Sequence, residues 1–222
     1  MNIYYVGGTV RDQLLNLKPK DVDLACEVDS FEEMKKYVLK NSSKIFLEKP
    51  EFGTIRYLNL KGEPQDISLC IKSRSVDSGS YQIGSIAEDL ANRDFTINAI
   101  ARNIETSVLH DPLGGQNDLK TKTIKCCNSP AKTFGDDPVR IIRALRFKLQ
   151  FGFSFDHSIA QYFTNSSSFD DLKLPHSERV RAELDKCFKI SPIGVFLEVE
   201  KINHAFLRVL FSNHGLKVGI SL

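Results

Sequence analysis

Cysteine is scarce in this sequence, and its spacing signals neither a disulfide framework nor a zinc site. Five cysteines occur among 222 residues, scattered singly except for the neighbours Cys126 and Cys127. No C-x-x-C pair accompanies a histidine cluster, so the sequence gives no support to the zinc-binding and disulfide-rich secreted classes. We expect reduced, half-buried thiols.

Long apolar runs are also missing. A membrane-spanning helix needs about eighteen or more consecutive apolar residues, and the sequence contains no such run. Its first residues, MNIYYVGG, lack the basic region followed by an apolar region of a secretory signal. We therefore expect no membrane association and a cytoplasmic location. Internal repeats and low-complexity tracts are absent too, which leaves one sizeable domain or two small ones.

Neither sign of charge is in clear excess. Thirty basic and 28 acidic residues give a formal net charge of +2, which is too balanced to indicate a polyanionic partner by itself. Local clusters of charge therefore carry more information than the total.

The sequence up to about residue 127 alternates short β-like runs with helical ones, which predicts an α/β fold. Turn residues at 61–64 (KGEP) separate two β-like runs, so residues 53–71 are predicted to form an antiparallel hairpin and the sheet to be mixed. Residues 72–84, rich in serine, glycine and charge, are predicted to be a mobile surface loop. The predicted strands are residues 3–6, 22–28, 53–60, 66–71, 108–111 and 123–127.

Helices are predicted at two capping boxes and throughout the last part of the chain. Ser30 and Glu33, like Ser85 and Glu88, have the spacing that begins a helix. From about residue 134 the apolar spacing is helical, with no strand signal. The sequence thus predicts an α/β head and an all-helical neck. The predicted domains are residues 1–133 and 134–222, and the predicted neck helices are residues 138–149, 157–165, 177–188 and 193–203.

Two aspartates one residue apart, Asp21 and Asp23, are the first candidate site. Alternate residues of a strand point to the same side, so these carboxylates are expected to converge. Like charges held together call for a cation, and Mg²⁺ suits a few hard oxygen ligands completed by water and substrate phosphates. Asp66 opens a strand that a neighbouring register could bring beside the pair. A lone D-x-D is more often a solvated strand end, so its surroundings decide.

A glycine turn precedes the aspartate pair. Gly7 and Gly8 end the first predicted strand, and a helical run follows, so the turn offers backbone N–H groups to an anion. Arg11 lies on the first turn of that run, where its guanidinium could grip a phosphate. Glycines, arginine and paired aspartates within so short a stretch predict a phosphate site beside a metal site.

A second cluster of charge lies on a predicted helix that Asp137 caps and that runs from Pro138 to about residue 149. Its arginines fall on one side and its apolar residues on the other. The nearby acids lie only at the helix start, so we expect no acid to pair with the last arginine. We expect a phosphate to pair with it instead. The arginines are Arg140, Arg143 and Arg146.

Five ordered stretches together resemble the class II tRNA nucleotidyltransferase and bacterial poly(A) polymerase family, whose head is polymerase β-like. They cover nearly the whole chain, in the order that the family has. The stretches are GGTVRD with KDVDLA, RDFTINAIA at 93–101, DPLGGQNDLKTKTIK at 111–125, DDPVRIIRALRF at 136–147 and ERVRAELDK at 178–186.

The resemblance implies a role for each candidate residue. Asp21, Asp23 and Asp66 are expected to be catalytic, with magnesium on Asp21 and Asp23. Asp137 and Arg140 are expected to pair with the edge of the incoming base, and the flexible loop at 72–84 to help the pocket change from cytosine to adenine. The nucleotide-binding residues implied are Gly7, Gly8, Arg11, Arg93, Asp94, Asn98, Asp137, Arg140, Arg143 and Arg146.

The implied reaction adds C, A or both to the 3′ end of tRNA from CTP and ATP, without a nucleic-acid template, and releases pyrophosphate. Two alternatives stay open at this point: a poly(A) polymerase, and a non-catalytic RNA-binding fragment of a longer enzyme. Family members commonly continue into a body and tail that contact tRNA. We therefore expect the neck, an oligomer or a partner subunit to help hold the RNA.

Overall fold

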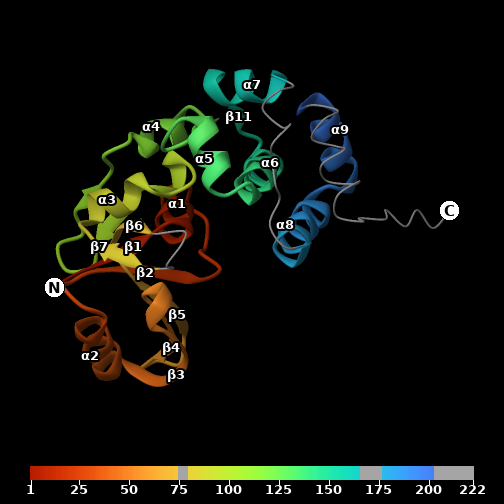
Figure 1. The fold of residues 1–222 in the computed structure, drawn as a ribbon. Helices are drawn as coiled ribbons and strands as arrows, with labels where there is room; N and C mark the ends of the chain where they lie inside the picture. Colours follow the sequence, from red (N-terminus) through yellow and green to blue (C-terminus); the bar gives the residue numbers. More distant parts are fainter. Residues whose placement is uncertain (75–79, 166–176, 203–222) are drawn as a thin grey trace. The chain divides into compact units, whose positions relative to one another are not determined.

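The computed structural model describes residues 1–74, 80–165 and 177–202, and the chain divides into two compact units, Met1–Leu119 and Lys120–Leu222. The predicted functional division into residues 1–133 and 134–222 places the boundary later than this division and stays a prediction. Figure 1 traces the elements of both units along the chain.

A seven-stranded mixed sheet forms the centre of the first unit, in the order β3-β4-β5-β2-β1-β8-β9. β2 and β5 pair in parallel, and every other neighbouring pair of this sheet is antiparallel. The predicted mixed sheet and the hairpin of β4 and β5 are confirmed. The strands are β1 (Asn2–Val6), β2 (Val22–Glu27), β3 (Ser42–Lys49), β4 (Thr54–Asn59), β5 (Pro64–Leu69), β8 (Ala101–Asn103) and β9 (Leu109–His110).

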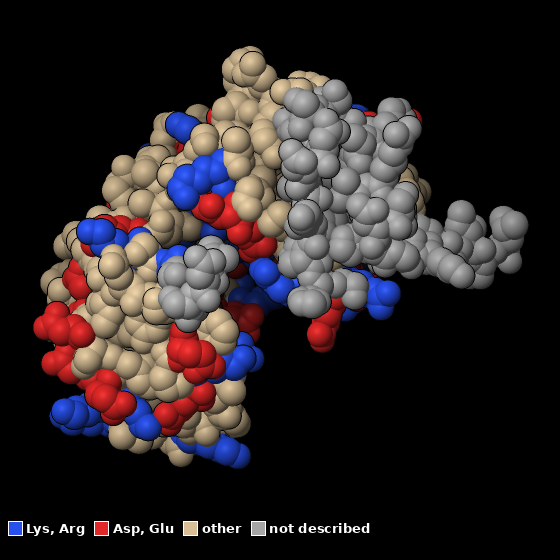
Figure 2. Space-filling model, viewed as in Figure 1, with Lys and Arg blue, Asp and Glu red and all other residues tan. Residues whose placement is uncertain are grey.

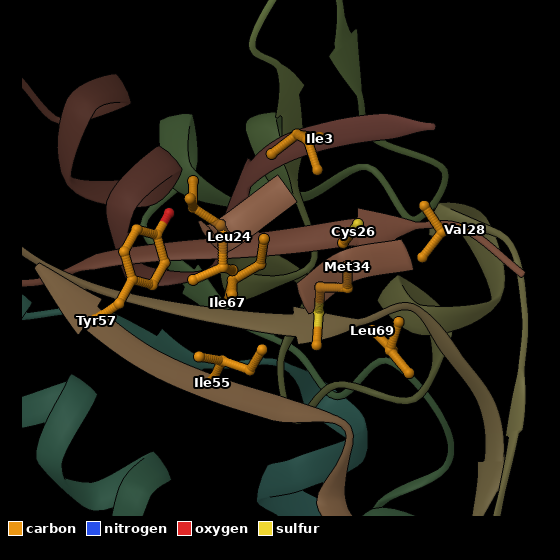
Figure 3. Packing of buried hydrophobic residues seen from close by; sticks show 10 residues of the cluster. Ile3, Leu24, Cys26, Val28, Met34, Ile55, Tyr57, Ile67 and Leu69 are labelled. Carbon is orange, nitrogen blue, oxygen red and sulfur yellow. The ribbon is translucent and has the colours of Figure 1, made fainter. Parts of the chain in front are cut away.

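The apolar faces of these strands meet helix α2 (Phe31–Asn41) in one buried cluster (Figure 3). Met34 and Val38 of α2 are fully buried there, and burial of each such side chain contributes about 1.5–3 kcal/mol. The cluster fixes β2 and β5 side by side, which matters because both strands carry candidate aspartates. The residues of the cluster are Ile3, Leu24, Cys26, Val28, Met34, Val38, Ile55, Tyr57, Ile67 and Leu69.

Both predicted helix starts in the first unit are confirmed. Ser30 accepts the Glu33 N–H, and Ser85 forms a complete capping box with Glu88. These side chains satisfy backbone groups that a helix start leaves unpaired. The helices of this unit are α1 (Gly8–Leu14), α2, the 3₁₀ turn η1 (Pro50–Phe52), α3 (Ile86–Ala91), the 3₁₀ turn η2 (Thr96–Asn98) and α4 (Gly115–Lys120).

The prediction of one loop at residues 72–84 is wrong at both ends. Residues on either side form an antiparallel hairpin, β6 (Ile71–Arg74) with β7 (Tyr81–Ile83). Arg74 donates hydrogen bonds to the carbonyls of Glu51 and Phe52, and this contact stabilises a stretch whose composition indicates a loop. The predicted movement of residues 72–84 stays a prediction, and residues 75–79 of this stretch lie outside the described residues.

Three further local features differ from the sequence pattern. β3 was not predicted, and its irregular pairing with β4, with two shifts of register, hides the alternation that indicates a strand. The 3₁₀ turn η2 was not predicted either, and β8 begins soon after it, at Ala101. β8 is a short, almost wholly buried strand, so it lacks the polar alternation of a half-exposed one.

Helices dominate the second unit, as predicted. The arginine helix is α6, which begins one residue after Pro138 and ends where Gly152 takes a left-handed conformation, with φ of 67°. The short parallel pair β10 and β11 was predicted only in its first strand, and β11 falls inside the region expected to be all helical. The elements are β10 (Thr123–Ile124), α5 (Pro130–Asp136), α6 (Val139–Phe151), β11 (Ser154–Phe155), α7 (His157–Thr164), α8 (Ser177–Ile190) and α9 (Pro192–Ile202).

The cysteines, the helix lengths and the surface charges can be compared with what the composition predicts. All five cysteines are free thiols, and four are buried more deeply than expected, with only Cys127 half-buried. Within the described ranges, no helix combines the length and apolar character needed to cross a bilayer. Figure 2 shows basic and acidic side chains interspersed over the visible face, in keeping with the near-zero net charge.

Candidate nucleotidyltransferase site

Asp21 and Asp23 lie where β2 begins, but not both on the strand as predicted. Asp23 is the second residue of β2, whereas Asp21 occupies a bend directly before it. Asp21 is exposed and Asp23 is half-buried. The two charges still act on one another, because Asp21 contributes to a raised pKa of Asp23.

The sheet register brings Asp66 beside Asp23. β2 and β5 pair in parallel with Asp23 opposite Asp66, which is the neighbouring-strand position that the sequence suggested. Both oxygens of Asp66 accept from Arg56 of β4 at 2.6 Å, in a bidentate ion pair. Arg56 was not among the predicted residues, although its position opposite Asp66 in the β4–β5 hairpin is a signal that could have indicated it. Asp66 thus stands next to the pair with its carboxylate already engaged.

Burial and charge act in opposite directions on Asp23. Burial raises the pKa of its carboxyl, the Arg93 charge lowers it, and the neighbouring carboxylates of Asp66 and Asp21 raise it again. On balance the pKa of Asp23 is raised, so ionisation of its carboxyl is less favourable than that of an ordinary exposed aspartate. A bound cation would reverse this balance, because an opposite charge favours the ionised form.

Gly7 lies at the junction of β1 and α1, against the same aspartate. Its φ of 62° is in the left-handed region, which favours glycine. A Cβ atom on Gly7 would lie 3.0 Å from Nη1 of Arg93 and 3.8 Å from Oδ2 of Asp23. The glycine therefore leaves room for two candidate side chains from distant parts of the sequence, Arg93 and Asp23.

A pocket of about 230 Å³ opens between these groups. Arg93 contributes one wall, and its guanidinium also pairs with Asp89 at 2.9 Å. A larger pocket of about 650 Å³ lies at the opposite end of β2, where Glu27 and Tyr37 line it, and contains none of the candidate residues. We assign the site to the smaller pocket, because the carboxylates and the arginine meet there. Its lining is Val6, Asp23, Leu24, Thr54, Asp66, Ile67, Ser68 and Arg93.

Arg11, Asn98 and Asp94 form a buried hydrogen-bonded chain. Nη1 of Arg11 donates to Oδ1 of Asn98 at 2.7 Å, and Nδ2 of Asn98 donates to Asp94 at 3.0 Å. The other side of the Arg11 fork donates to Asp12 at 2.7 and 2.9 Å. Each of the three predicted residues is at most 7% exposed. The structure brings these three together, and Asp12 is a further partner that was not predicted.

The aspartate pair suits a metal that keeps part of its own hydration. Across residues 1–74, 80–165 and 177–202, no group of three or more His, Cys, Asp and Glu side chains could hold a metal ion. Mg²⁺ commonly binds one or two carboxylates and takes its other ligands from water and substrate phosphates. The oxygen donors and the raised pKa of Asp23 fit such an ion at this position.

In the second unit, an acid pairs with arginines of α6, so the prediction that no acid would pair with Arg146 is wrong. Glu183 of α8 accepts from Nε of Arg146 at 2.8 Å and lies 3.9 Å from Nη1 of Arg143. It is 7% exposed. Burial alone would raise the pKa of Glu183, but hydrogen bonds from Lys186 and Arg146 lower it overall. The acid comes from a helix far along the chain, where helical spacing on α6 gives no signal.

The start of α6 is held from α8 as well. The predicted cap is wrong by one residue, because the N-cap position of α6 is Pro138 and no side chain caps the helix there. Oδ1 of Asp137 accepts the Val139 N–H at 3.3 Å, and Oδ2 pairs with Arg179 at 2.8 Å. Arg140 donates to the carbonyl of Thr133 at 3.4 Å. The structure thus brings Asp137 and Arg140 together at the start of one helix.

A mixed sheet that carries paired aspartates beside a glycine turn is the fold of a polymerase β-like nucleotidyltransferase head. Residues 3–125 match the family model described as the poly A polymerase head domain. The chain belongs to the class II tRNA nucleotidyltransferase and poly(A) polymerase family. Nucleotidyltransferases of this family generally use a divalent metal ion.

Three curated relatives show how similar the chain is. It is 35% identical over 194 residues to a CCA-adding enzyme of Listeria monocytogenes, covering 84% of this chain and 46% of the relative. It is 34% identical over 181 residues to a CC-adding tRNA nucleotidyltransferase of Geobacter sulfurreducens, covering 82% and 39%. A Multifunctional CCA protein of Actinobacillus pleuropneumoniae is 32% identical over 229 residues, covering 99% and 53%. The chain thus spans about half the length of the relatives it matches.

Solved structures agree in fold. A CCA-adding enzyme in complex with CTP superposes with a TM-score of 0.79 at 29% identity, over 95% of this chain and 49% of that one. The Thermotoga maritima CCA-adding enzyme complexed with tRNA gives 0.77 at 28% identity, over 95% and 48%. The predicted α/β head followed by a helical neck is thereby confirmed as the fold.

Proposed function

We propose that this chain is the catalytic part of a tRNA nucleotidyltransferase that adds C, A or both to the 3′ end of tRNA from CTP and ATP, with Mg²⁺. The observation that carries the proposal is the meeting of Asp23, Asp66 and Arg93 around one pocket beside Gly7. Transfer of a nucleotidyl group requires carboxylates that bind a cation and, next to them, a basic side chain such as arginine that binds phosphate. The names of the relatives support tRNA as the acceptor.

Within this proposal, Asp21 and Asp23 hold magnesium, which when bound would neutralise charge on the phosphates and polarise the attacking 3′-hydroxyl. Gly7 and Gly8 let the nucleotide approach the backbone, and Arg93 binds a phosphate oxygen. Arg11, Asp94 and Asn98, which are buried and linked by hydrogen bonds, bind the phosphates and the ribose. Asp66 acts more weakly, since Arg56 already engages both of its oxygens.

For the second unit we propose that α6 selects and holds the nucleotide. The carboxylate of Asp137 offers acceptors and the guanidinium of Arg140 offers donors, each group planar, which together can complement a base edge. Arg143 and Arg146 hold phosphate or sugar without reading the base. Glu183 engages both arginines, so the charge they offer to an anion is smaller than three arginines alone would suggest.

The test is to incubate the purified protein and Mg²⁺ with tRNA that lacks its CCA end, and to supply CTP, ATP or both. Gel analysis of terminal lengths then separates the branches. Two added residues with CTP alone and three with both nucleotides indicate a CCA-adding enzyme. Two residues under both conditions indicate CC addition, and one residue on a tRNA ending in CC indicates A addition.

A poly(A) polymerase is the second candidate, favoured by the description of the matching family model. Long tails from ATP alone on an unrelated RNA would establish it. No incorporation under any condition would contradict both candidates and favour a non-catalytic RNA-binding fragment. An oligomer or partner subunit that completes the hold on tRNA, and a cytoplasmic location, stay predictions.

A further inference from the structure

The hydroxyl of Thr9 bridges the backbone on both sides of Val22, between the two candidate metal ligands. Oγ1 of Thr9 donates to the carbonyl oxygen of Asp21 at 3.2 Å and accepts the N–H of Asp23 at 2.9 Å. Thr9 belongs to α1 and is only 1% exposed. One buried side chain therefore touches both halves of the D-x-D stretch.

The sheet leaves these backbone groups without a strand on that side. β1 pairs with β2 as far as Tyr5 opposite Leu24, and β1 ends at Val6 before the chain turns at Gly7. In an antiparallel ladder, the carbonyl of one residue and the N–H of the second residue after it face the same neighbour. The Thr9 hydroxyl therefore takes the place of the next hydrogen-bonding partner that a longer β1 would have provided.

We propose that Thr9 is a positioning residue, which fixes the backbone at Asp21 and Asp23 so that the two carboxylates face one cation. The inference rests on the proposed function only in taking these aspartates as metal ligands. Thr9 itself touches neither metal nor substrate. Outer partners that orient metal ligands typically contribute about 10- to 100-fold to metal affinity.

A hydroxyl suits this position for a physical reason. It can donate and accept at once, whereas an amide or ammonium of similar reach uses separate atoms or only donates. Asp21 precedes the strand in a bend, so β2–β5 pairing, which begins at Val22, leaves its backbone less constrained than that of Asp23. The bridge to Thr9 ties that bend to the strand.

The experiment compares the wild type with Thr9→Val, which keeps the shape and removes the hydroxyl, and with Thr9→Ser, which keeps the hydroxyl. Mn²⁺ alone serves as the probe, and its free concentration is followed by electron paramagnetic resonance without substrate. We expect Thr9→Val to raise the Mn²⁺ dissociation constant about 10- to 100-fold and Thr9→Ser to restore it to within about threefold. The Mg²⁺ concentration for half-maximal incorporation should shift in parallel.

A second measurement needs neither metal nor activity. Hydrogen exchange at the Asp23 amide should become about tenfold faster in Thr9→Val, because its acceptor is gone. Thr133→Val is the matched control, since Thr133 is also 1% exposed but, among the described residues, its hydroxyl has no hydrogen-bond partner. That control should change neither Mn²⁺ affinity nor Asp23 exchange. If Thr9→Val does not fold, Thr9→Cys, with a weakly bonding thiol, takes its place.

The two failures can be told apart. A wild type that binds Mn²⁺ but adds no nucleotide contradicts the proposed function and leaves the role of Thr9 measurable through binding and exchange. Mn²⁺ affinity in folded Thr9→Val within about twofold of the wild type overturns the inference, as does a wild type that binds no Mn²⁺ at all. Loss of affinity in Thr9→Ser equal to that in Thr9→Val also overturns it, because the hydroxyl would then not be what matters.

Discussion

At the start of β2, Asp23 lies beside Asp21 and Asp66, and burial together with these charges raises the pKa of its carboxyl. On α6, Arg143 and Arg146 are also like charges one turn apart, but Glu183 engages both. The first unit thus carries an electrostatic cost that a bound cation would relieve, whereas the second unit relieves its own. A raised pKa of a partly buried carboxyl beside other carboxylates is typical of functional sites. The difference supports the proposal that the aspartates of the first unit bind a metal ion, whereas Glu183 already neutralises part of the charge on α6.

The largest effect is expected at Asp23, one of the two proposed metal ligands. Changing Asp23 to Asn should reduce incorporation by at least about 1000-fold, since the residue is one of two proposed metal ligands. The same change should raise the thermal midpoint of the metal-free protein, because it removes a buried charge that has like-charged neighbours. Calorimetry without metal and primer-extension assays with Mg²⁺ measure the two quantities.

Three further variants sharpen that result. Asp21→Ala should abolish incorporation as well, while Asp66→Asn should have a weaker effect because Arg56 holds both oxygens of Asp66. Asp29→Asn, an exposed change just beyond the other end of β2, is the control and should leave both quantities unchanged. Near-normal turnover in a folded Asp23→Asn protein would contradict the assignment of the metal site.

The next effect concerns Glu183 of the second unit. Its removal leaves Arg143 and Arg146 without the acid that pairs with both of them. We expect Glu183→Ala to lower the free energy of unfolding of the second unit by about 3 kcal/mol, the typical cost of breaking a buried ion pair. Urea denaturation of the whole chain, followed by helical circular dichroism, provides the measurement.

Glu198→Ala is the matched control, because Glu198 pairs with Lys148 and Lys201 near the surface. Such pairs are worth about 0–1 kcal/mol. Equal losses in the two variants would show that Glu183 stabilises α6 no more than the partly exposed Glu198 does.

A smaller effect is expected on nucleotide choice. Arg140→Lys should change the preference among the four triphosphates by about tenfold, since a point charge cannot present the planar fork of a guanidinium. Arg143→Lys should instead raise the nucleotide KM for all bases alike. Competition assays with all four triphosphates distinguish the two patterns. An unchanged preference in an active Arg140→Lys protein would mean that the base is read elsewhere.

Local sequence signals were enough for much of the fold. The helix starts at Ser30 and Ser85, the turn at residues 61–64 and the two-sided pattern of α6 each depend on residues a few positions apart, and each is present in the structure. The D-x-D stretch beside a glycine turn is equally local. Its placement next to Arg93 follows once the sheet forms.

The remaining features depend on partners far apart in sequence. Arg146 and Glu183 are separated by 37 positions, and no periodicity on α6 reveals the acid. Arg74 stabilises the β6 strand through carbonyls of η1, so a serine- and glycine-rich stretch forms a hairpin against its own composition. The Thr9 bridge depends on where β1 stops pairing. Tertiary contacts decide each of these, and intrinsic preference is only a weak guide to them.

The smallest effect is a pH dependence carried by Glu183. Burial raises the pKa of its carboxyl, but hydrogen bonds from Lys186 and Arg146 and the Arg143 charge lower it below its ordinary value. A lowered pKa in the folded state stabilises the protein above the unfolded value of about 4.3, and this stabilisation is lost as the pH falls through the folded value. The wild type should therefore lose its advantage over Glu183→Gln below about pH 4, by at most about 1.4 kcal/mol for each pH unit. Urea unfolding of both proteins from neutral pH downward measures the gap, and a gap that stays constant to pH 3 would mean that the carboxylate charge does not brace α6.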